Sequence, residues 1–470
     1  MRRTVIAVVL TGAALALVPA AAAGTPLAAA QARTHLGPPV LIHPGEIQAL
    51  GNFNQPPTTA DCEASYQVAC YEPGQVQQAY GLPALYANGV TGRGQTIIIV
   101  DSFGSPTIAS DLATFDSTFG LPAPPSLTIL QPAGPVPPFD PTNGDMLGWA
   151  GETTLDVEYA HTVAPDASIV LLETPVSETE GTTGFPQIVT AEEYAISHNL
   201  GGVISQSFSA TEQTFATKQQ IEGLRGAYED AFAHNITVLS AAGDSGAANV
   251  GSDGETYYTY PTTTWPPSDP LVTGVGGTQL HLNANGNHTS PDTVWNDTYN
   301  VPTNQFIFGD NGPNPLAGGG GLSIWFQRPS YQDSAAGIVG DARGVPDISM
   351  SAACNGAVDV YQSFPGEPAG WYPTCGTSEA TPLFAGIVSL ADQVAGHPLG
   401  LINPALYQLS AENAPGIVNV TSGNNTVTFT QDNQTYTVTG FNAGPGYNLA
   451  TGVGTVFAPA FVYELAQAAG

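Results

Sequence analysis

Short apolar runs alternate along the chain with segments in which apolar residues recur every three or four positions. Continuous runs rich in Val and Ile are typical of strands buried on both faces. We expect such strands at Gly94–Gly104, Ala167–Thr174, Gly201–Ser209 and Asn235–Gly246, and helices at Ala191–Asn199 and Glu222–Asn235. Because strands and helices alternate, the pattern predicts an α/β fold with a parallel sheet and a functional site at the carboxyl ends of its strands.

One helical segment carries two acidic residues at a spacing that suits acid–base catalysis. In GWAGETTLDVEYAHTVAP, Glu152 and Asp156 are four residues apart and lie on the same face of a helix. A solvated acidic face is the alternative, but no Lys or Arg occurs between Arg93 and Lys218 to balance the pair. Two adjacent carboxyls share a proton, and the one with the raised pKa can act as base and then as acid at low pH.

A serine stands at the start of another helical segment, CGTSEATPLFAGIVSLADQ, at Ser378. Its hydroxyl either caps the helix or serves as a nucleophile presented at a helix N-terminus. A nucleophile needs a base, and the candidates are the carboxyl pair or His161, for which a role as a helix-end or core histidine is the alternative. Asp244, in SAAGDSGA, either forms an Asx turn after a strand or joins this site.

The strongly negative net charge excludes some classes of binding partner. The 470 residues contain 8 Lys and Arg against 39 Asp and Glu, a formal charge of −31. Such a surface has no basic patch for phosphates, so we expect neither nucleic acid nor a membrane as a partner. The excess of carboxyls suits a protein that works in acid, although solubility at neutral pH would explain it equally well.

The N-terminus and the cysteines point to export. Residues 1–23 have two arginines, an apolar run and small residues, the pattern of a secretory signal peptide. Four cysteines are then candidates for disulfides. Their order favours two local loops, Cys62 with Cys70 and Cys354 with Cys375, without proving that pairing.

Several ordered motifs together resemble the sedolisin, or serine-carboxyl peptidase, family. They are the Glu152/Asp156 helix, the GDSG loop, GGGGLSIWFQRPSYQ, VPDISMSA, GTSEATPLFAGI and AGPGYNLATGVGT. The resemblance runs from about Tyr71 to the C-terminus. It implies a subtilisin-like parallel sheet flanked by helices, in a single large catalytic domain at 71–470. The stretch 24–70 is then a short N-terminal segment without a full pro-domain.

The resemblance also implies roles for individual residues. Ser378 would be the nucleophile, Glu152 its general base and later acid, and Asp156 the group that orients Glu152. A protonated Asp244 would stabilise the oxyanion. The implied substrate-binding residues are Ser207, Phe208, Ser209, Gly376 and Thr377. We therefore expect a secreted, monomeric peptidase that acts in acid on proteins or peptides.

The calcium site of the family is altered. The matching positions are Asn419, Val420, Gly444, Gly446 and Asn448. Asparagine stands at both positions where the family has aspartate, and calcium affinity falls with ligand charge, so we expect calcium to bind weakly or not at all. Ser209 also replaces a glycine common in the family.

Two other functions remain open at this point. One is a catalytically impaired secreted binding protein on the same scaffold. The other is a histidine-based subtilisin-like protease that uses Asp101 and Ser378. A pH–rate profile distinguishes these alternatives from the carboxyl mechanism. An acid optimum supports the carboxyl mechanism, a neutral or alkaline optimum supports the histidine-based protease, and no activity at any pH supports the binding protein.

Overall fold

The four predicted strands lie side by side in one sheet of a computed structural model that describes residues 48–309 and 312–470. The predicted signal peptide at 1–23 lies outside the described residues, and the domain boundary at residue 71 stays a prediction. Within the described ranges, eight strands join in the order β11-β10-β8-β6-β3-β5-β4, with β14 beside β10. Their bounds are β3 Thr96–Ser102, β4 Leu127–Leu130, β5 Ser168–Thr174, β6 Val203–Gln206, β8 Thr237–Ala241, β10 Thr273–Gln279, β11 Thr293–Val294 and β14 Ile348–Ser351.

All pairings in this sheet except β10 with β11 are parallel, as the alternation of strands and helices predicts. Strand β3 shows why the apolar runs are continuous. Ile97 and Ile99 face one hydrophobic cluster, whereas Ile98 and Val100 face another on the opposite side. Because successive side chains of a strand point to opposite faces, a strand covered on both sides must be apolar at every position.

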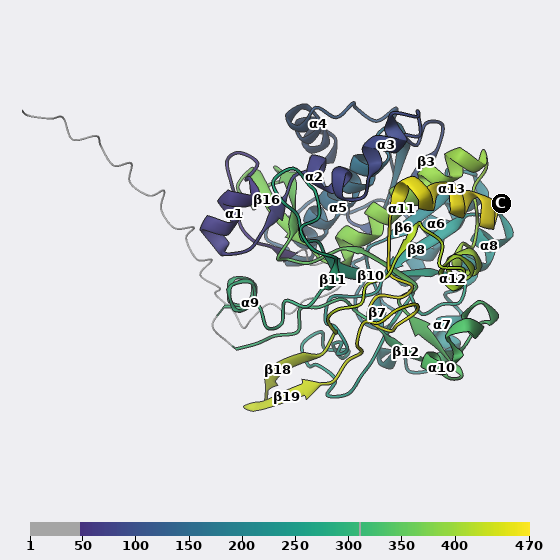
Figure 1. The fold of residues 1–470 in the computed structure, drawn as a ribbon. Coiled ribbons are helices and arrows are strands. Elements are labelled where there is room, and N and C mark those ends of the chain that lie inside the picture. The colour runs from purple at the N-terminus through teal and green to yellow at the C-terminus, as the bar shows by residue number, and fades with distance from the viewer. Residues whose placement is uncertain (1–47, 310–311) are drawn as a thin grey trace, which may run out of the picture. The chain divides into compact units, whose positions relative to one another are not determined.

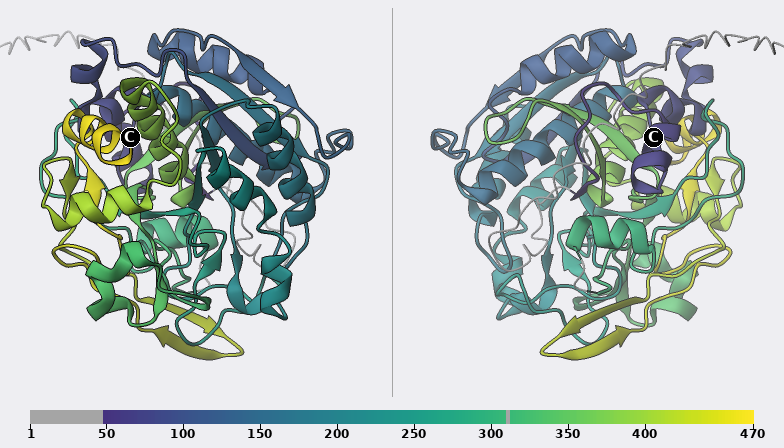
Figure 2. Two further views of the ribbon diagram at one scale, coloured as in Figure 1. Left: turned by 90° about the vertical axis from the view of Figure 1, so that its right-hand side faces the viewer. Right: turned by 90° about the vertical axis from the view of Figure 1, so that its left-hand side faces the viewer.

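Helices cover the two faces of the sheet, as Figure 1 and, from the sides, Figure 2 show. Residues of α5 and α11 belong to one hydrophobic cluster, and residues of α6 and α8 belong mainly to the other. The helices run α1 Thr59–Tyr66, α2 Pro73–Ala79, α3 Leu82–Tyr86, α4 Ile108–Phe119, α5 Gly144–Val163, α6 Phe185–Ser197, α7 Lys218–Glu222, α8 Gly226–Ala233, α9 Val301–Phe308, α10 Ala336–Val339, α11 Thr377–Ala395, α12 Asn403–Ala411 and α13 Ala458–Ala469, with 3₁₀ turns η1 Glu212–Thr214 and η2 Ser330–Ala335.

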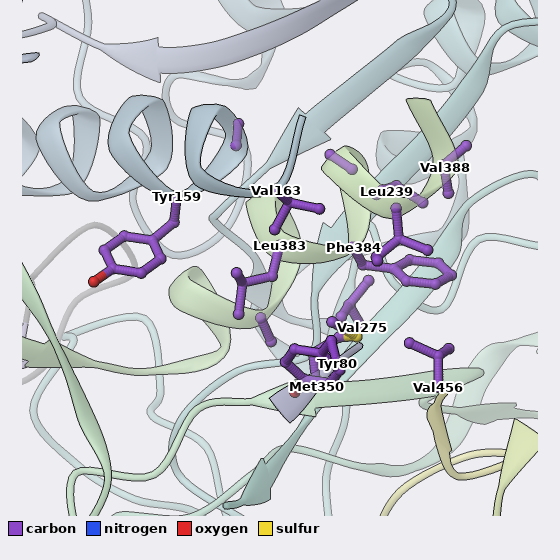
Figure 3. Packing of buried hydrophobic residues seen from close by; sticks show 14 of the residues in the cluster. Tyr80, Tyr159, Val163, Leu239, Val275, Met350, Leu383, Phe384, Val388 and Val456 are labelled. Carbon is purple, nitrogen blue, oxygen red and sulfur yellow. The ribbon is translucent and has the colours of Figure 1, made fainter. Parts of the chain in front are cut away.

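The helices that carry the candidate residues pack tightly against each other. In Figure 3, Val163 of α5 lies next to Leu383 of α11 in the apolar core. At Gly386 the two helices approach so closely that a Cβ atom would lie 2.5 Å from the Cβ of Val163. A glycine is therefore required there, and the contact fixes α5 and α11 relative to each other.

Smaller sheets surround this core. One contains β1 Gln48–Ala49, β2 Cys70–Tyr71, β15 Ala357–Gln362 and β16 Gly370–Cys375. The pairs are β7 Ala210–Thr211 with β9 Thr264–Trp265, β12 Gly321–Gln327 with β13 Ala342–Val345, β17 Ile417–Val418 with β20 Thr455–Val456, and β18 Val427–Gln431 with β19 Gln434–Val438. Both expected disulfides are present, Cys62–Cys70 and Cys354–Cys375.

The structure departs from the predicted helix at Glu222–Asn235. This segment forms the end of α7 and the separate helix α8. The break follows from Gly223 and Gly226, since glycine is a poor helix former. Among the described residues no helix is both long and apolar enough to cross a bilayer.

Candidate active site

Residues from four elements meet at the carboxyl ends of the strands. Helix α5 carries Glu152 and Asp156, and Ser378 lies in the first turn of α11. Asp244 follows β8, and Ser207 follows β6, which lies beside β8 in the sheet. The hydroxyl of Ser207 links them, because it donates to Asp156 Oδ1 at 2.8 Å and lies 3.3 Å from the carbonyl oxygen of Ser378.

Ser378 lies in the first turn of its helix without capping it. Between Thr377 and Asp392 of α11 it is the one residue that is not buried. The N-cap of this helix is Gly376, which makes no side-chain capping bond. The hydroxyl of Ser378 instead lies 3.5 Å from the carbonyl oxygen of Ser207. The capping alternative is therefore wrong, and the hydroxyl is accessible at the helix N-terminus.

Glu152 and Asp156 form a buried pair, with 1% and 0% of their surface exposed. Burial raises the pKa of Glu152 well above its usual range, and the hydroxyl of Ser378 acts in the opposite direction by favouring the carboxylate. Burial likewise raises the pKa of Asp156, and the charge of Glu152 raises it further. No described residue donates to Glu152 Oε1 or Asp156 Oδ2. Both shifts favour the protonated carboxyls, the direction that the sequence predicts for one member of the pair.

A third carboxyl, Asp101, completes this cluster at the end of β3. It is fully buried and has no cation partner among the described residues, and the Thr153 hydroxyl is the group that favours its ionised form. Burial raises the pKa of Asp101 to about 7. Its charge raises the pKa values of both Glu152 and Asp156. Sequence reasoning placed Asp101 only in the histidine-based alternative, although its position directly after the buried run TIIIV was the available signal.

Asp244 lies against the two residues before Ser378 and is held by hydrogen bonds from Thr377. Its Oδ1 accepts hydrogen bonds from the Thr377 amide at 2.8 Å and from the Thr377 hydroxyl at 2.7 Å. Burial raises the pKa of Asp244 to about 6, against the effect of these two bonds. A Cβ at Gly376 would lie 2.7 Å from Asp244 Oδ2. Glycine is therefore needed at 376, and the contacts to Thr377 exclude a merely local Asx turn.

The predicted substrate-binding residues differ in what their side chains contact. Ser207 and Ser209 are buried, and Ser207 bonds Asp156. The ring of Phe208 packs in the core near Trp149 and Phe185, with ring centres 6.2 and 6.1 Å away. The side chain of Phe208 is therefore structural, and a contact with substrate through its backbone stays a prediction.

His161 lies in the core, away from Ser378. It is fully buried on α5, its Nε2 is 2.7 Å from the carbonyl oxygen of Pro122, and the same atom is 3.2 Å from Asp116 Oδ1. The geometry thus gives no support to a histidine base. The core interpretation of His161 is confirmed.

Four of the five positions that match the family's calcium site take part in hydrogen bonds. Asn419 Oδ1 accepts from the Gly446 amide at 2.6 Å. Asn448 Oδ1 accepts from the amides of Ala450 and Thr451. The Nδ2 group of Asn448 donates to the carbonyl oxygen of Gly444 at 3.3 Å. Both asparagine side-chain oxygens already accept backbone amides and neither supplies charge, so these side chains fit calcium poorly.

No other acidic side chains form a metal site in the part of the chain that the structure describes. Among the described residues no group of three or more His, Cys, Asp or Glu side chains could hold a metal ion.

Comparison with known proteins gives a consistent set of relatives. Kumamolisin from Bacillus sp. (strain MN-32) is 32% identical over 392 residues, which is 82% of this chain and 62% of that protein. Human tripeptidyl-peptidase 1 is 29% identical over 334 residues, 68% of this chain and 52% of that protein. The chain thus spans about half to three fifths of the length of these curated relatives. No family model matches the chain.

A solved structure shares the fold. Pseudomonas sedolisin, a serine-carboxyl proteinase complexed with two molecules of pseudo-iodotyrostatin, matches with a TM-score of 0.67 at 24% identity. The match covers 85% of this chain and 99% of that one. The likeness shows the predicted α/β fold, with its parallel sheet flanked by helices.

Proposed function

The chain belongs to the sedolisin family, and from this premise we propose that it is a serine-type peptidase that cuts peptide bonds in acid. The observation that carries the proposal is the placement of Ser378. Its accessible hydroxyl lies beside Glu152, whose buried carboxyl belongs to a cluster able to hold and release protons. A serine hydroxyl is a weak nucleophile until an adjacent base takes its proton.

In the first step Glu152 accepts the proton of Ser378 as the oxygen forms a bond to the substrate carbonyl carbon. Asp156 and Asp101 act as positioning residues that keep a proton in the cluster and Glu152 oriented. Glu152 then gives the proton to the leaving amine as the peptide C–N bond breaks. A water molecule attacks the acyl-enzyme ester by the same proton route, which releases the acid product and restores the Ser378 hydroxyl.

Asp244 supplies a hydrogen bond to the tetrahedral oxyanion when it is protonated. Because Oδ1 already accepts two bonds from Thr377, the proton belongs on Oδ2. No described residue donates to Oδ2, so a hydroxyl there is free to donate to substrate. An ionised Asp244 would repel the oxyanion instead. Catalysis therefore needs a pH below the Asp244 pKa of about 6.

The proposed setting follows from the same groups. We expect a secreted, monomeric protein whose pH optimum lies roughly between 3 and 5, where carboxyls exchange protons. Its substrates are proteins or peptides, with no nucleic acid or membrane partner. The loop around Asn419 and Asn448 is stable without calcium.

A pH–rate profile of the wild type and Asp244→Asn tests this function. Asparagine is a permanent donor, so the variant should keep some activity and extend its alkaline limb toward neutral pH. The measurement is kcat/KM for cleavage of an unfolded protein or a quenched peptide between about pH 2 and 8. If the alkaline limb is the same in the variant and the wild type, the group that titrates there belongs to the Glu152 cluster. A wild-type optimum above about pH 7 contradicts the carboxyl mechanism.

A further inference from the structure

A cavity opens near the active site at the same edge of the sheet. Its volume is about 160 Å³, close to the roughly 150 Å³ of a cavity that accepts benzene. Buried residues form its base and exposed residues its rim. The base is Ser105, Met146 and Glu173, and the rim includes Pro106, Gln131 and Pro137. The cavity therefore has room for one long side chain that enters from solvent.

Glu173 gives this cavity a buried acid that no described cation balances. Its Oε2 accepts from Gln131 Nε2 at 2.8 Å, but no described residue donates to Oε1 and no described cation pairs with it. A Cβ at Gly104, where φ is +74°, would lie 2.0 Å from Oε1. Glycine is therefore required at 104, because any side chain there would displace the Glu173 carboxyl. Burial raises the pKa of Glu173, because its charge has no cation nearby.

The cavity lies within reach of a peptide held at Ser378. Glu173 pairs in register with Asp101 of the carboxyl cluster. Met146 precedes Glu152 by six residues on α5, a distance of about 9 Å along a helix axis. An extended peptide advances about 3.3 Å per residue. A peptide that runs from Ser378 along α5 would therefore reach the cavity with the second or third residue from the cleaved bond.

We propose that this cavity is a substrate subsite for a basic side chain, arginine or lysine, and that Glu173 determines its specificity. The inference rests on the proposed function. Apolar groups of Phe103, Phe139 and Met146 line the walls and suit the aliphatic stem of such a side chain. The cationic end then bonds Glu173 Oε1, which supplies the partner that a buried carboxyl lacks.

Quenched peptides with arginine, citrulline or norleucine at one position test the proposal. The position is varied over three residues on each side of the bond, and kcat/KM is measured at about pH 5.5. Citrulline has nearly the shape of arginine without its charge. At one position the wild type should prefer arginine to citrulline roughly tenfold, and in Glu173→Gln this ratio should fall to about one.

Asp145→Asn is the matched control, because Asp145 is exposed in the first turn of α5 and does not line the cavity. It removes the same charge and should leave the ratio unchanged. The proposal is overturned if no position prefers arginine, if Glu173→Gln retains the preference, or if citrulline and arginine are cleaved equally well.

A failure of the proposed function gives a different result, since then no peptide is cleaved. Binding of fluorescein-labelled arginine and citrulline peptides, measured by anisotropy, then tests the cavity itself. A preference for arginine that Glu173→Gln removes supports the subsite. Equal binding of both peptides overturns it.

Discussion

Two buried groups of charged residues in this protein are built in opposite ways. In the carboxyl cluster around Glu152, no described cation pairs with Asp101, and the Thr153 hydroxyl alone favours its ionised form. At the far side of β10, Asp347 accepts from both terminal nitrogens of Arg343, at 2.8 and 2.5 Å, from the Gly274 amide and from the Tyr407 hydroxyl, each at 2.8 Å. Both carboxyls are fully buried.

The comparison shows that a cation partner, or its absence, determines whether a buried carboxyl is suited to a structural role or to proton transfer. A carboxylate that is fully bonded to a cation stays ionised and stabilises one arrangement of the chain. A buried carboxyl without a cation has a raised pKa, so it holds its proton up to a higher pH, and its ionised form is a stronger base toward a nearby hydroxyl. The Arg343–Asp347 pair is thus a structural device, whereas the cluster around Glu152 is suited to proton transfer at a cost in stability.

The largest expected effect separates function from stability at Ser378. Ser378→Ala should lower kcat by roughly 10⁴-fold or more, because no other nucleophile is available. Its free energy of unfolding should stay within about 0.5 kcal/mol of the wild type, since the hydroxyl makes no capping bond. Peptide hydrolysis and urea denaturation measure the two quantities. Retained turnover with lowered stability would return Ser378 to a structural role.

The converse effect is expected at the ion pair. Arg343→Met leaves Asp347 buried without its cation, which should lower the free energy of unfolding by about 3–5 kcal/mol. The double variant Arg343→Met/Asp347→Asn should recover part of this loss, because a neutral amide removes the uncompensated charge. Thermal and urea denaturation measure both. A small effect of the single change would mean that the pair is no more structural than the cluster.

A pH series sharpens the comparison. The folded-state pKa values of Asp101 and Asp244 are raised, to about 7 and about 6, above the roughly 3.9 of an unfolded chain. Groups raised in this way stabilise the fold below their unfolded pKa, and that contribution is lost as pH rises through the folded pKa. Stability should therefore fall between about pH 4 and 7, by on the order of 7 kcal/mol if both groups contribute fully.

Ser378→Ala is the suitable background for this series, because it prevents self-digestion. Asp101→Asn added to it should flatten the dependence, since its amide does not ionise. A stability maximum at neutral pH would contradict the assignment of protons to the cluster.

Sequence patterns predicted what depends on neighbours along the chain. The continuous apolar run of β3 identified a strand covered on both faces, and the four-residue spacing placed Glu152 and Asp156 together on α5. Contacts between segments that are distant in the sequence could not be predicted from such local patterns. The bonds from Thr377 to Asp244 and the position of Asp101 beside the pair arise from the order of strands in the sheet, which no local pattern specifies.

The smallest expected effect concerns a third polar region, the loop of Asn419 and Asn448, where hydrogen bonds take the place of charge. Adding a chelator to the wild type should shift the melting temperature by less than about 2 °C, because the loop is closed by its own amides. A large loss of melting temperature would show that the two asparagines hold calcium after all.

Asn419→Asp/Asn448→Asp should reverse this behaviour. Aspartate at 448 lacks the Nδ2 donor to the Gly444 carbonyl oxygen, so without calcium the two carboxylates repel each other and the carbonyls, and the variant should be less stable than the wild type. Calcium at a hundred times its Kd should then restore about 2.7 kcal/mol. Melting temperatures with calcium and with chelator measure the difference. A loop indifferent to calcium in both proteins would mean that its backbone, rather than the charge of its side chains, excludes the ion.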